Sequence, residues 1–337
     1  MCHVAMRQIL DPTPRPLALA LQGGGSFGAF TWGVLDRLLA EPSVPLAAVS
    51  GASAGAVNAV LLADGLVAGG REEARARLAR FWHLLSDRAG MAGLPVLGSV
   101  LAMAELPMPP FGFTLPGPDP LKDLLGDLVD FRRLRAERPV PLLIAATRVR
   151  DGEARIFRED EITLDAVLAS ACLPLLREAV VIDGEPYWDG GYSANPPLRD
   201  LIRATTAEDL LLVQLAPDAR EGSPRLRHDI QHRSLEIAFS APLRRELQAI
   251  EDMRSLCAEA LALRPSLCRQ LDRLRLHRLS MWDELGDAAG ANPANVSWPF
   301  ISRLAEAGRV AAGRWLDEAG AGTPGQPGGD WSPGTGA

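Results

Sequence analysis

The chain has 337 residues, of which 47% are hydrophobic and 23% are charged, and its formal net charge is −7 at pH 7. This is the composition of an ordinary globular protein, with enough length for one large domain or two modest ones. A negative net charge disfavours a general nucleic-acid binder, because such a protein needs a basic face.

The four cysteines, Cys2, Cys172, Cys257 and Cys268, have the spacing of neither a zinc site nor a disulfide framework. We therefore expect free thiols in a reducing compartment. Residues 1–16 lack a charged region followed by a long apolar one, and no uncharged apolar run reaches the roughly 20 residues of a membrane-spanning helix. The sequence predicts a cytoplasmic protein without a signal peptide, and it is compatible with peripheral contact with a membrane.

The first third of the chain alternates strand-like and helix-like segments. Residues 17–22 predict a short buried strand, and after a run of glycines a helical pattern extends over residues 26–40. Residues 45–50 predict a second strand, residues 54–63 a second helix and residues 71–85 an amphipathic helix. Repetition of strand, turn and helix predicts parallel strands in an α/β sheet.

The pattern changes between Ala89 and Pro120, where proline and glycine recur and only Glu105 and Asp119 are charged. We expect a lid or an acyl-groove insertion over residues 89–118, and a set of buried strands is the alternative.

Regular structure resumes after the insertion. Residues 140–150 predict a strand, and Asp151 and Gly152 predict a hairpin turn after it. A helix is expected over residues 163–175, and another buried strand over residues 209–217. The remainder of the chain is mostly helical and rich in arginine, and its last residues, rich in glycine and proline, are expected to be disordered.

These patterns predict four parts. They are an N-terminal extension (residues 1–15), a catalytic domain (16–217), a C-terminal helical region (218–319) and a disordered tail (320–337).

The first motif is G-x-S-x-G, in which Gly51 and Gly55 flank Ser53 between a strand and a helix. This is the context of a nucleophile elbow, where the serine adopts a strained backbone conformation and glycines prevent clashes around it. The helix that follows adds amide donors and partial positive charge, which favour an alkoxide or an oxyanion. A turn of small residues without a catalytic role is the alternative.

The second motif is glycine-rich, and its Gly23, Gly25 and Gly28 fit G-x-G-x-x-G between a strand and a helix. A dinucleotide site needs an acidic residue about 20 residues later, at a strand end, and Asp36 and Glu41 come too early for this. The spacing therefore disfavours NAD. Exposed N–H groups of this loop could instead hold the oxyanion of a tetrahedral intermediate, and a tight turn without a ligand is the alternative.

The third motif is Asp189 followed by Gly190 and Gly191. Such a turn is common in loops, but in a chain with a candidate serine Asp189 becomes the candidate base.

The histidines do not offer a Ser-His-Asp triad, because none of them follows a predicted sheet strand. His228 and His232 are four residues apart and could share a helix face as metal ligands, but no third ligand completes the pattern. We therefore expect solvent-exposed histidines and no metal site.

Together the three motifs resemble the patatin-like phospholipase family, which combines a glycine-rich oxyanion loop, G-x-S-x-G and a later D-G-A/G in this order. The resemblance covers about residues 16–217, with 28 residues from Gly25 to Ser53 and 136 from Ser53 to Asp189. It implies a three-layer α/β fold with a mainly parallel central sheet and, in some bacterial members, extra C-terminal helices.

The resemblance implies a catalytic dyad, with Ser53 as nucleophile and Asp189 as proton acceptor, and no cofactor or metal. It also implies an oxyanion hole in the glycine-rich loop, formed by Gly23, Gly24, Gly25, Ser26 and Gly28. Two positions depart from the family pattern. Gln22 stands where aspartate is common, and Phe27 stands where arginine or lysine is common, which puts in doubt any ionic contact from that position to an anionic headgroup.

The expected activity is hydrolysis of lipid acyl esters, as in a phospholipase A, a lysophospholipase or an esterase, through a covalent acyl-enzyme. An acyltransferase or a thioesterase could use the same dyad. A non-catalytic lipid-binding or regulatory protein on the same fold is the alternative of another class. The expected partner is a lipid or acyl-ester substrate and not nucleic acid.

Overall fold

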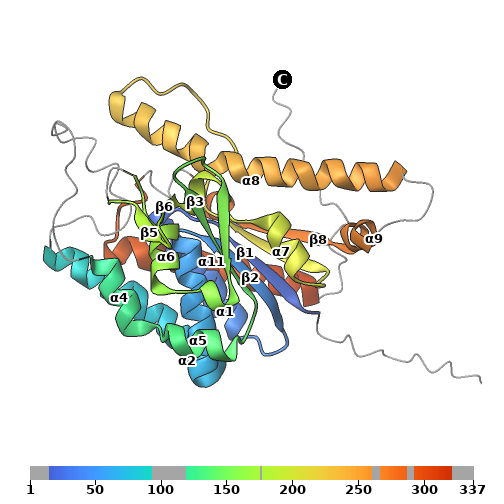
Figure 1. Ribbon diagram of the computed structural model, residues 1–337, viewed down its shortest axis with the longest axis horizontal. Coiled ribbons are helices and arrows are strands. Elements are labelled where there is room, and N and C mark those ends of the chain that lie inside the picture. The colour runs from blue at the N-terminus through green and yellow to red at the C-terminus, as the bar shows by residue number, and fades with distance from the viewer. Residues whose placement is uncertain (1–14, 93–118, 175–176, 260–265, 287–291, 321–337) are drawn as a thin grey trace, which may run out of the picture.

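The computed structural model describes residues 15–92, 119–174, 177–259, 266–286 and 292–320, and a single mixed sheet runs through it (Figure 1). Its strands are β1 (Leu17–Leu21), β2 (Leu46–Ala52), β3 (Leu142–Arg148), β4 (Ala154–Arg158), β5 (Val180–Ile182), β6 (Glu185–Asp189), β7 (Asp209–Gln214) and β8 (Arg275–Ser280). Their order is β5-β6-β3-β2-β1-β7-β8, with β4 paired to β3. The central pairs are parallel, and β4, β5 and β6 pair antiparallel.

The helices that cover the sheet are α1 (Gly28–Leu39), α2 (Ala54–Ala92), α4 (Pro120–Leu128), α5 (Phe131–Glu137), α6 (Leu164–Ser170), α7 (Leu198–Ala204), α8 (Arg227–Glu259), α9 (Ser266–Arg273), α10 (Met281–Leu285) and α11 (Trp298–Gly320). Short 3-10 turns follow the glycine-rich loop (η1, Gly25–Phe27), β4 (η2, Glu159–Glu161) and β6 (η3, Gly190–Tyr192).

Strand β1 explains how the two helical layers are held to the sheet. It is apolar throughout and fully buried, as expected of a central strand covered on both faces. Because side chains alternate along a strand, Leu19 and Leu21 pack with α1, α2 and α11, whereas Ala18 and Ala20 pack with α7 and α8 on the opposite face. The three-layer α/β fold expected from the sequence is confirmed.

The C-terminal region contributes more than helices to this core. Strand β8 pairs in parallel with β7 and extends the sheet, a strand that the sequence pattern did not predict. Helix α11 packs so closely against α1 that only glycine fits at position 33. A Cβ atom on Gly33 would lie 1.9 Å from the carbonyl oxygen of Ala305. Residues 218–319 therefore build part of the central core beside residues 16–217.

The predicted helices at residues 54–63 and 71–85 are the two parts of α2. The helix is interrupted at Gly69 and Gly70, and Gly70 has a φ of 76°, a conformation that glycine adopts readily.

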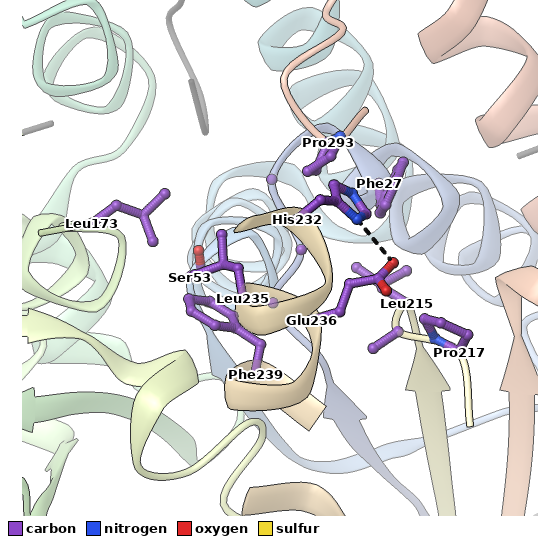
Figure 2. A pocket seen from close by; sticks show the side chains of 14 residues that line it. Phe27, Ser53, Leu173, Leu215, Pro217, His232, Leu235, Glu236, Phe239 and Pro293 are labelled. Atoms are coloured by element: carbon purple, nitrogen blue, oxygen red, sulfur yellow. Dashed lines mark ion pairs between the residues drawn. The ribbon is translucent and has the colours of Figure 1, made fainter. Parts of the chain in front are cut away.

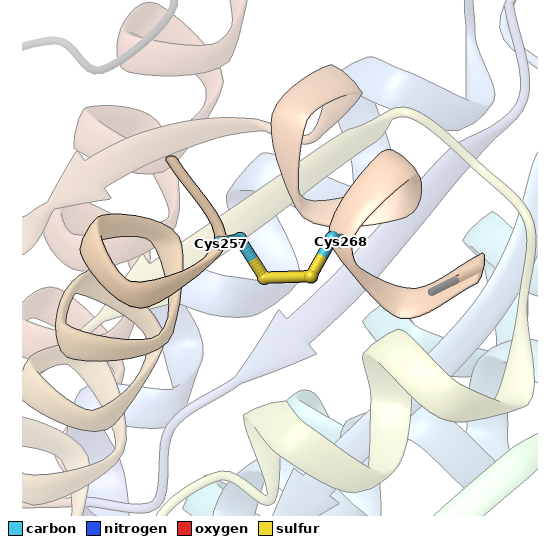
Figure 3. Close-up of a disulfide and its surroundings, with 2 residues drawn as sticks. All are labelled: Cys257 and Cys268. Carbon is cyan, nitrogen blue, oxygen red and sulfur yellow. A yellow bond between two sulfur atoms is a disulfide. The ribbon is translucent and has the colours of Figure 1, made fainter. Parts of the chain in front are cut away.

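The expectation of free thiols is wrong for two of the cysteines. Cys257 and Cys268 form a disulfide that joins the end of α8 to α9 (Figure 3). The two helices bring their Cα atoms to 5.4 Å, within the range of a disulfide, and a separation of 11 residues does not reveal this proximity. Cys172 is a free, buried thiol, and burial raises its pKa to about 11.

The lid or acyl-groove insertion expected over residues 89–118 lies almost entirely outside the described residues, as do most of the N-terminal extension and the tail. Of the helices that the structure describes, none combines the length and the apolar character needed to cross a bilayer. The described residues also contain no cluster of three or more histidine, cysteine, aspartate or glutamate side chains arranged to hold a metal ion.

Candidate active site

Ser53 occupies the turn between β2 and α2. Its φ of 53° is rare for a residue other than glycine, as expected of a nucleophile elbow. The flanking glycines permit the close packing of this turn. A Cβ atom on Gly51 would lie 2.5 Å from the backbone of Gly55, and one on Gly55 would lie 2.1 Å from the carbonyl oxygen of Leu21. The Ser53 N–H donates to Ser170 Oγ at 2.9 Å, which fixes the turn further.

Asp189 lies at the end of β6, and the sheet brings it close to Ser53. Strand β3 separates β2 from β6, and the register pairs Ala52 with Ala145 and Ala146 with Asp189. The residue after Ala52 and the last residue of β6 therefore flank β3 from its two sides near Ala146. The two predicted catalytic residues, 136 positions apart, are neighbours for this reason.

The Asp189 side chain is completely buried, with 0% of its surface exposed. Its Oδ1 atom accepts a hydrogen bond of 2.7 Å from the Gly191 N–H, whereas Oδ2 has no hydrogen-bond partner among the described residues. Burial raises the pKa of Asp189 to about 7, although the Gly191 amide and the nearby Ser53 hydroxyl act to lower it. The carboxyl group therefore titrates close to neutral pH.

The two glycines after Asp189 allow close contacts on both sides of the turn. A Cβ atom on Gly190 would lie 2.1 Å from the carbonyl oxygen of Ala145 in β3. A Cβ atom on Gly191 would lie 2.2 Å from the ring of Phe239, which α8 places against the turn. Phe239 thus covers the Asp189 turn from the side of α8.

The glycine-rich loop is held by a residue that the sequence analysis did not identify. The Gly23 N–H donates to Asn195 Oδ1 at 2.7 Å, and Asn195 Nδ2 donates to the Phe239 carbonyl at 3.0 Å. Asn195 is fully buried. No local pattern indicates this role, because Gly23 and Asn195 are 172 positions apart.

Not all five residues of the expected oxyanion hole have an N–H group available for a substrate oxygen. Besides Gly23, two more of the five predicted residues donate within the protein: the Ser26 N–H to the Pro293 carbonyl at 2.9 Å, and the Gly28 N–H to carbonyls of the preceding turn. The N–H groups of Gly24 and Gly25 make no hydrogen bond with a described residue, and both glycines line the same pocket as Ser53. Gly25 has a φ of 60°, which glycine tolerates.

The two departures from the family pattern have structural roles. Gln22 Oε1 accepts hydrogen bonds from the N–H groups of Leu215 and Ala216, at 2.7 and 2.8 Å, and so joins the loop to the end of β7. Phe27 is buried, and its ring centroid lies 6.5 Å from that of Trp282 in an edge-to-face contact. An aromatic contact thus replaces a cation at this position.

A mostly apolar cavity of about 80 Å³ opens over Ser53 (Figure 2). Its walls come from the glycine-rich loop, the segment after β7 and the first part of α8. The lining residues are Gly23, Gly24, Gly25, Phe27, Ser53, Leu173, Leu215, Ala216, Pro217, His232, Leu235, Glu236, Phe239 and Pro293. Its mostly apolar lining favours apolar groups over charged ones.

His232 is not a solvent-exposed residue, which corrects the expectation from the sequence. It lines the pocket, 14% of its side chain is exposed, and its Nδ1 atom lies 3.5 Å from Glu236 Oε1 (Figure 2). The reason is that α8 lies across the site and turns this face inward. The side chain of His228 lies outside the described part of the chain.

A family model described as patatin-like phospholipase matches residues 19–202. Among solved structures, VipD from Legionella pneumophila is 18% identical, with a TM-score of 0.43, over 90% of this chain and 67% of that one. The type III effector protein ExoU is 16% identical, with a TM-score of 0.38, over 90% of this chain and 53% of the ExoU chain. A search of curated protein sequences found no match.

Proposed function

Since the chain belongs to the patatin-like phospholipase family, we propose that it hydrolyses lipid acyl esters with Ser53 as nucleophile and Asp189 as base. The observation that carries this proposal is the position of a buried carboxyl group, whose pKa is about 7, beside a serine with a φ of 53° on a strand-to-helix turn. Strained serines and carboxyl groups with raised pKa values are features of catalytic sites.

In the first step the Ser53 hydroxyl donates its proton to Asp189 Oδ2, the oxygen without a partner among the described residues. The Ser53 Oγ atom forms a bond to the ester carbonyl carbon, and the carbonyl oxygen becomes an oxyanion. A free carboxylate is too weak a base for this reaction. Burial makes Asp189 more basic and raises its pKa to about 7, a value suited to a general base near neutral pH.

The N–H groups of Gly24 and Gly25 stabilise the oxyanion in this proposal, because both residues line the pocket that contains Ser53. Helix α2 begins at Ala54, directly after the nucleophile, and its N-terminal amides add partial positive charge. One oxyanion-hole donor typically contributes about 10²–10³ in rate.

The intermediate then collapses. The bond from the carbonyl carbon to the alcohol oxygen breaks, the leaving alcohol takes the proton from Asp189, and the acyl group remains on Ser53. In the second half Asp189 removes a proton from water, whose oxygen attacks the acyl-enzyme. The carboxylic acid leaves when the Ser53 oxygen recovers that proton. The apolar walls formed by Leu215, Leu235 and Phe239 hold the acyl chain.

The experiment compares Ser53→Ala and Asp189→Asn with the wild type on p-nitrophenyl esters and on phospholipid vesicles, with product analysis for free fatty acid. Each variant is expected to lose at least about 10³-fold in kcat/KM. Ser50→Ala is the matched control, because Ser50 is a buried serine of the same β2 strand that does not line the pocket. It should retain wild-type activity within about twofold. Activity that survives in Ser53→Ala would refute the assignment of the nucleophile.

A further inference from the structure

The first part of α8 carries an exposed apolar stripe. Large hydrophobic side chains are exposed at six positions of the described chain, and three of these positions fall within 12 residues of one another. They are Leu226, Ile230 and Ile237, which are 60%, 46% and 48% exposed. Leu226 belongs to the helical stretch, because its carbonyl accepts the Ile230 N–H at 3.0 Å. We call these three residues the outer stripe.

The outer stripe lies on the side of α8 that faces away from the catalytic pocket. Its members are four and seven residues apart, so in a helix with 3.6 residues per turn they fall within an arc of about 40°. The pocket-lining residues of the same helix, among them Leu235 and Phe239, are centred about 150° away on the helix circumference. This part of α8 therefore lies between the pocket and the outer stripe, and Figure 2 shows it beside Ser53.

The same segment is basic, although the chain as a whole is acidic. Residues 225–245 contain five arginines and two acidic residues, whereas the chain has a net charge of −7. Arg225, Arg227 and Arg245 are exposed. An apolar stripe flanked by arginines on one helix is the pattern of helices that lie in the interface of an anionic membrane.

We propose that the outer stripe and its flanking arginines dock the protein on an anionic lipid surface, with the pocket directly behind α8. The choice of a lipid surface rests on the proposed function, because an enzyme for lipid esters must reach a substrate held in a bilayer. A second copy of this chain fits the patch less well. A symmetric contact would place two basic segments against each other. Three half-exposed side chains also offer far less area than the about 800 Å² per partner of a stable dimer.

The test uses the full chain with Ser53→Ala, so that vesicles are not consumed, and measures co-sedimentation with vesicles of phosphatidylcholine and phosphatidylglycerol. The triple variant Leu226→Ser, Ile230→Ser and Ile237→Ser should lose at least about tenfold in partition coefficient, which corresponds to about 1.4 kcal/mol. Higher salt should also weaken binding, because it screens the arginines.

The matched control is the double variant Val181→Ser and Val310→Ser, which removes two exposed hydrophobic side chains that are 61% and 48% exposed elsewhere on the surface. It should bind vesicles as the parent protein does. Circular dichroism and urea unfolding establish that the variants fold.

Equal vesicle binding by the triple variant and the control would overturn the proposal, as would equal binding to pure phosphatidylcholine. A dimer that the triple variant dissolves, seen by size-exclusion chromatography, would also overturn it in favour of a protein contact. Failure of the proposed function can be distinguished from failure of the docking proposal. A protein with Ser53 intact that binds vesicles but hydrolyses no ester would refute that function alone, and one that hydrolyses dissolved esters without binding vesicles would refute docking alone.

Discussion

Replacement of Asp189 by asparagine should stabilise the folded protein at alkaline pH while it abolishes catalysis. The side chain is completely buried, and burial raises its pKa from 3.8 to about 7. Between these two values the folded protein retains a proton that the unfolded chain releases. Ionisation of Asp189 is therefore unfavourable in the folded state, and asparagine, which is nearly isosteric and neutral, avoids this effect.

The direction in which stability changes with pH follows from proton linkage. Because the folded protein binds more protons than the unfolded chain in this range, the contribution of Asp189 to the free energy of unfolding falls as the pH rises from about 4 to about 7 and is constant above that. The difference between 3.8 and about 7 corresponds to about 4 kcal/mol. The stability of Asp189→Asn relative to the wild type should therefore increase by up to about 4 kcal/mol between pH 4 and pH 8.

Urea unfolding at several pH values measures this difference, and unchanged m values would show that the variant unfolds in the same way. The control is Asp183→Asn, an exposed carboxylate in the turn between β5 and β6. A stability difference between wild type and Asp189→Asn that is the same at pH 4 and pH 8 would contradict the reasoning, because it would mean that the folded protein does not resist ionisation of Asp189.

Three further predictions concern the site. The kcat/KM for a dissolved ester should rise about tenfold per pH unit below pH 7 and level off above it as Asp189 ionises; a flat rate from pH 5 to pH 8 would exclude Asp189 as the base. Asn195→Ala should lower the free energy of unfolding by about 1–3 kcal/mol, because it leaves the buried Gly23 N–H without an acceptor; wild-type stability in urea would contradict this. Gly55→Ala should lower the free energy of unfolding by more than about 2 kcal/mol, because the added Cβ would lie 2.1 Å from the Leu21 carbonyl oxygen in β1. Gly126→Ala in α4 is the control and should not destabilise the protein, because the space around Gly126 is open. Equal effects of the two substitutions in urea unfolding would contradict this prediction.

The central strands could be predicted because their signal is local. Strand β1 is an uninterrupted apolar run that ends at glycines, and the structure places it within one residue of the predicted range. Strand β8 was not predicted because its sequence is polar: Arg275 and His277 both bond to Asp209 on the neighbouring strand, at 2.5 to 2.8 Å. Strand β8 thus pairs with β7 through contacts between polar and charged side chains, and it has no apolar sequence pattern from which a strand could be predicted.

The candidate site likewise has some residues that the sequence predicts and others that it does not. Ser53, Asp189 and the glycine-rich loop belong to short motifs, so each could be identified from its neighbours in sequence. The contact of Asn195 with the loop and the packing of Phe239 against the Asp189 turn depend on chain segments brought together by the fold. The inward-facing position of His232 depends likewise on where α8 lies. A single sequence contains no local signal for such contacts.

The most direct test of the catalytic assignment is covalent labelling with a fluorophosphonate, read by mass spectrometry of the digested protein. The wild type should carry the label on Ser53 alone, with a labelling rate that rises with pH through about 7, the pKa of Asp189. Labelling should disappear in Ser53→Ala and become slow in Asp189→Asn. A label on another residue, or equal labelling of the wild type and Ser53→Ala, would contradict the account.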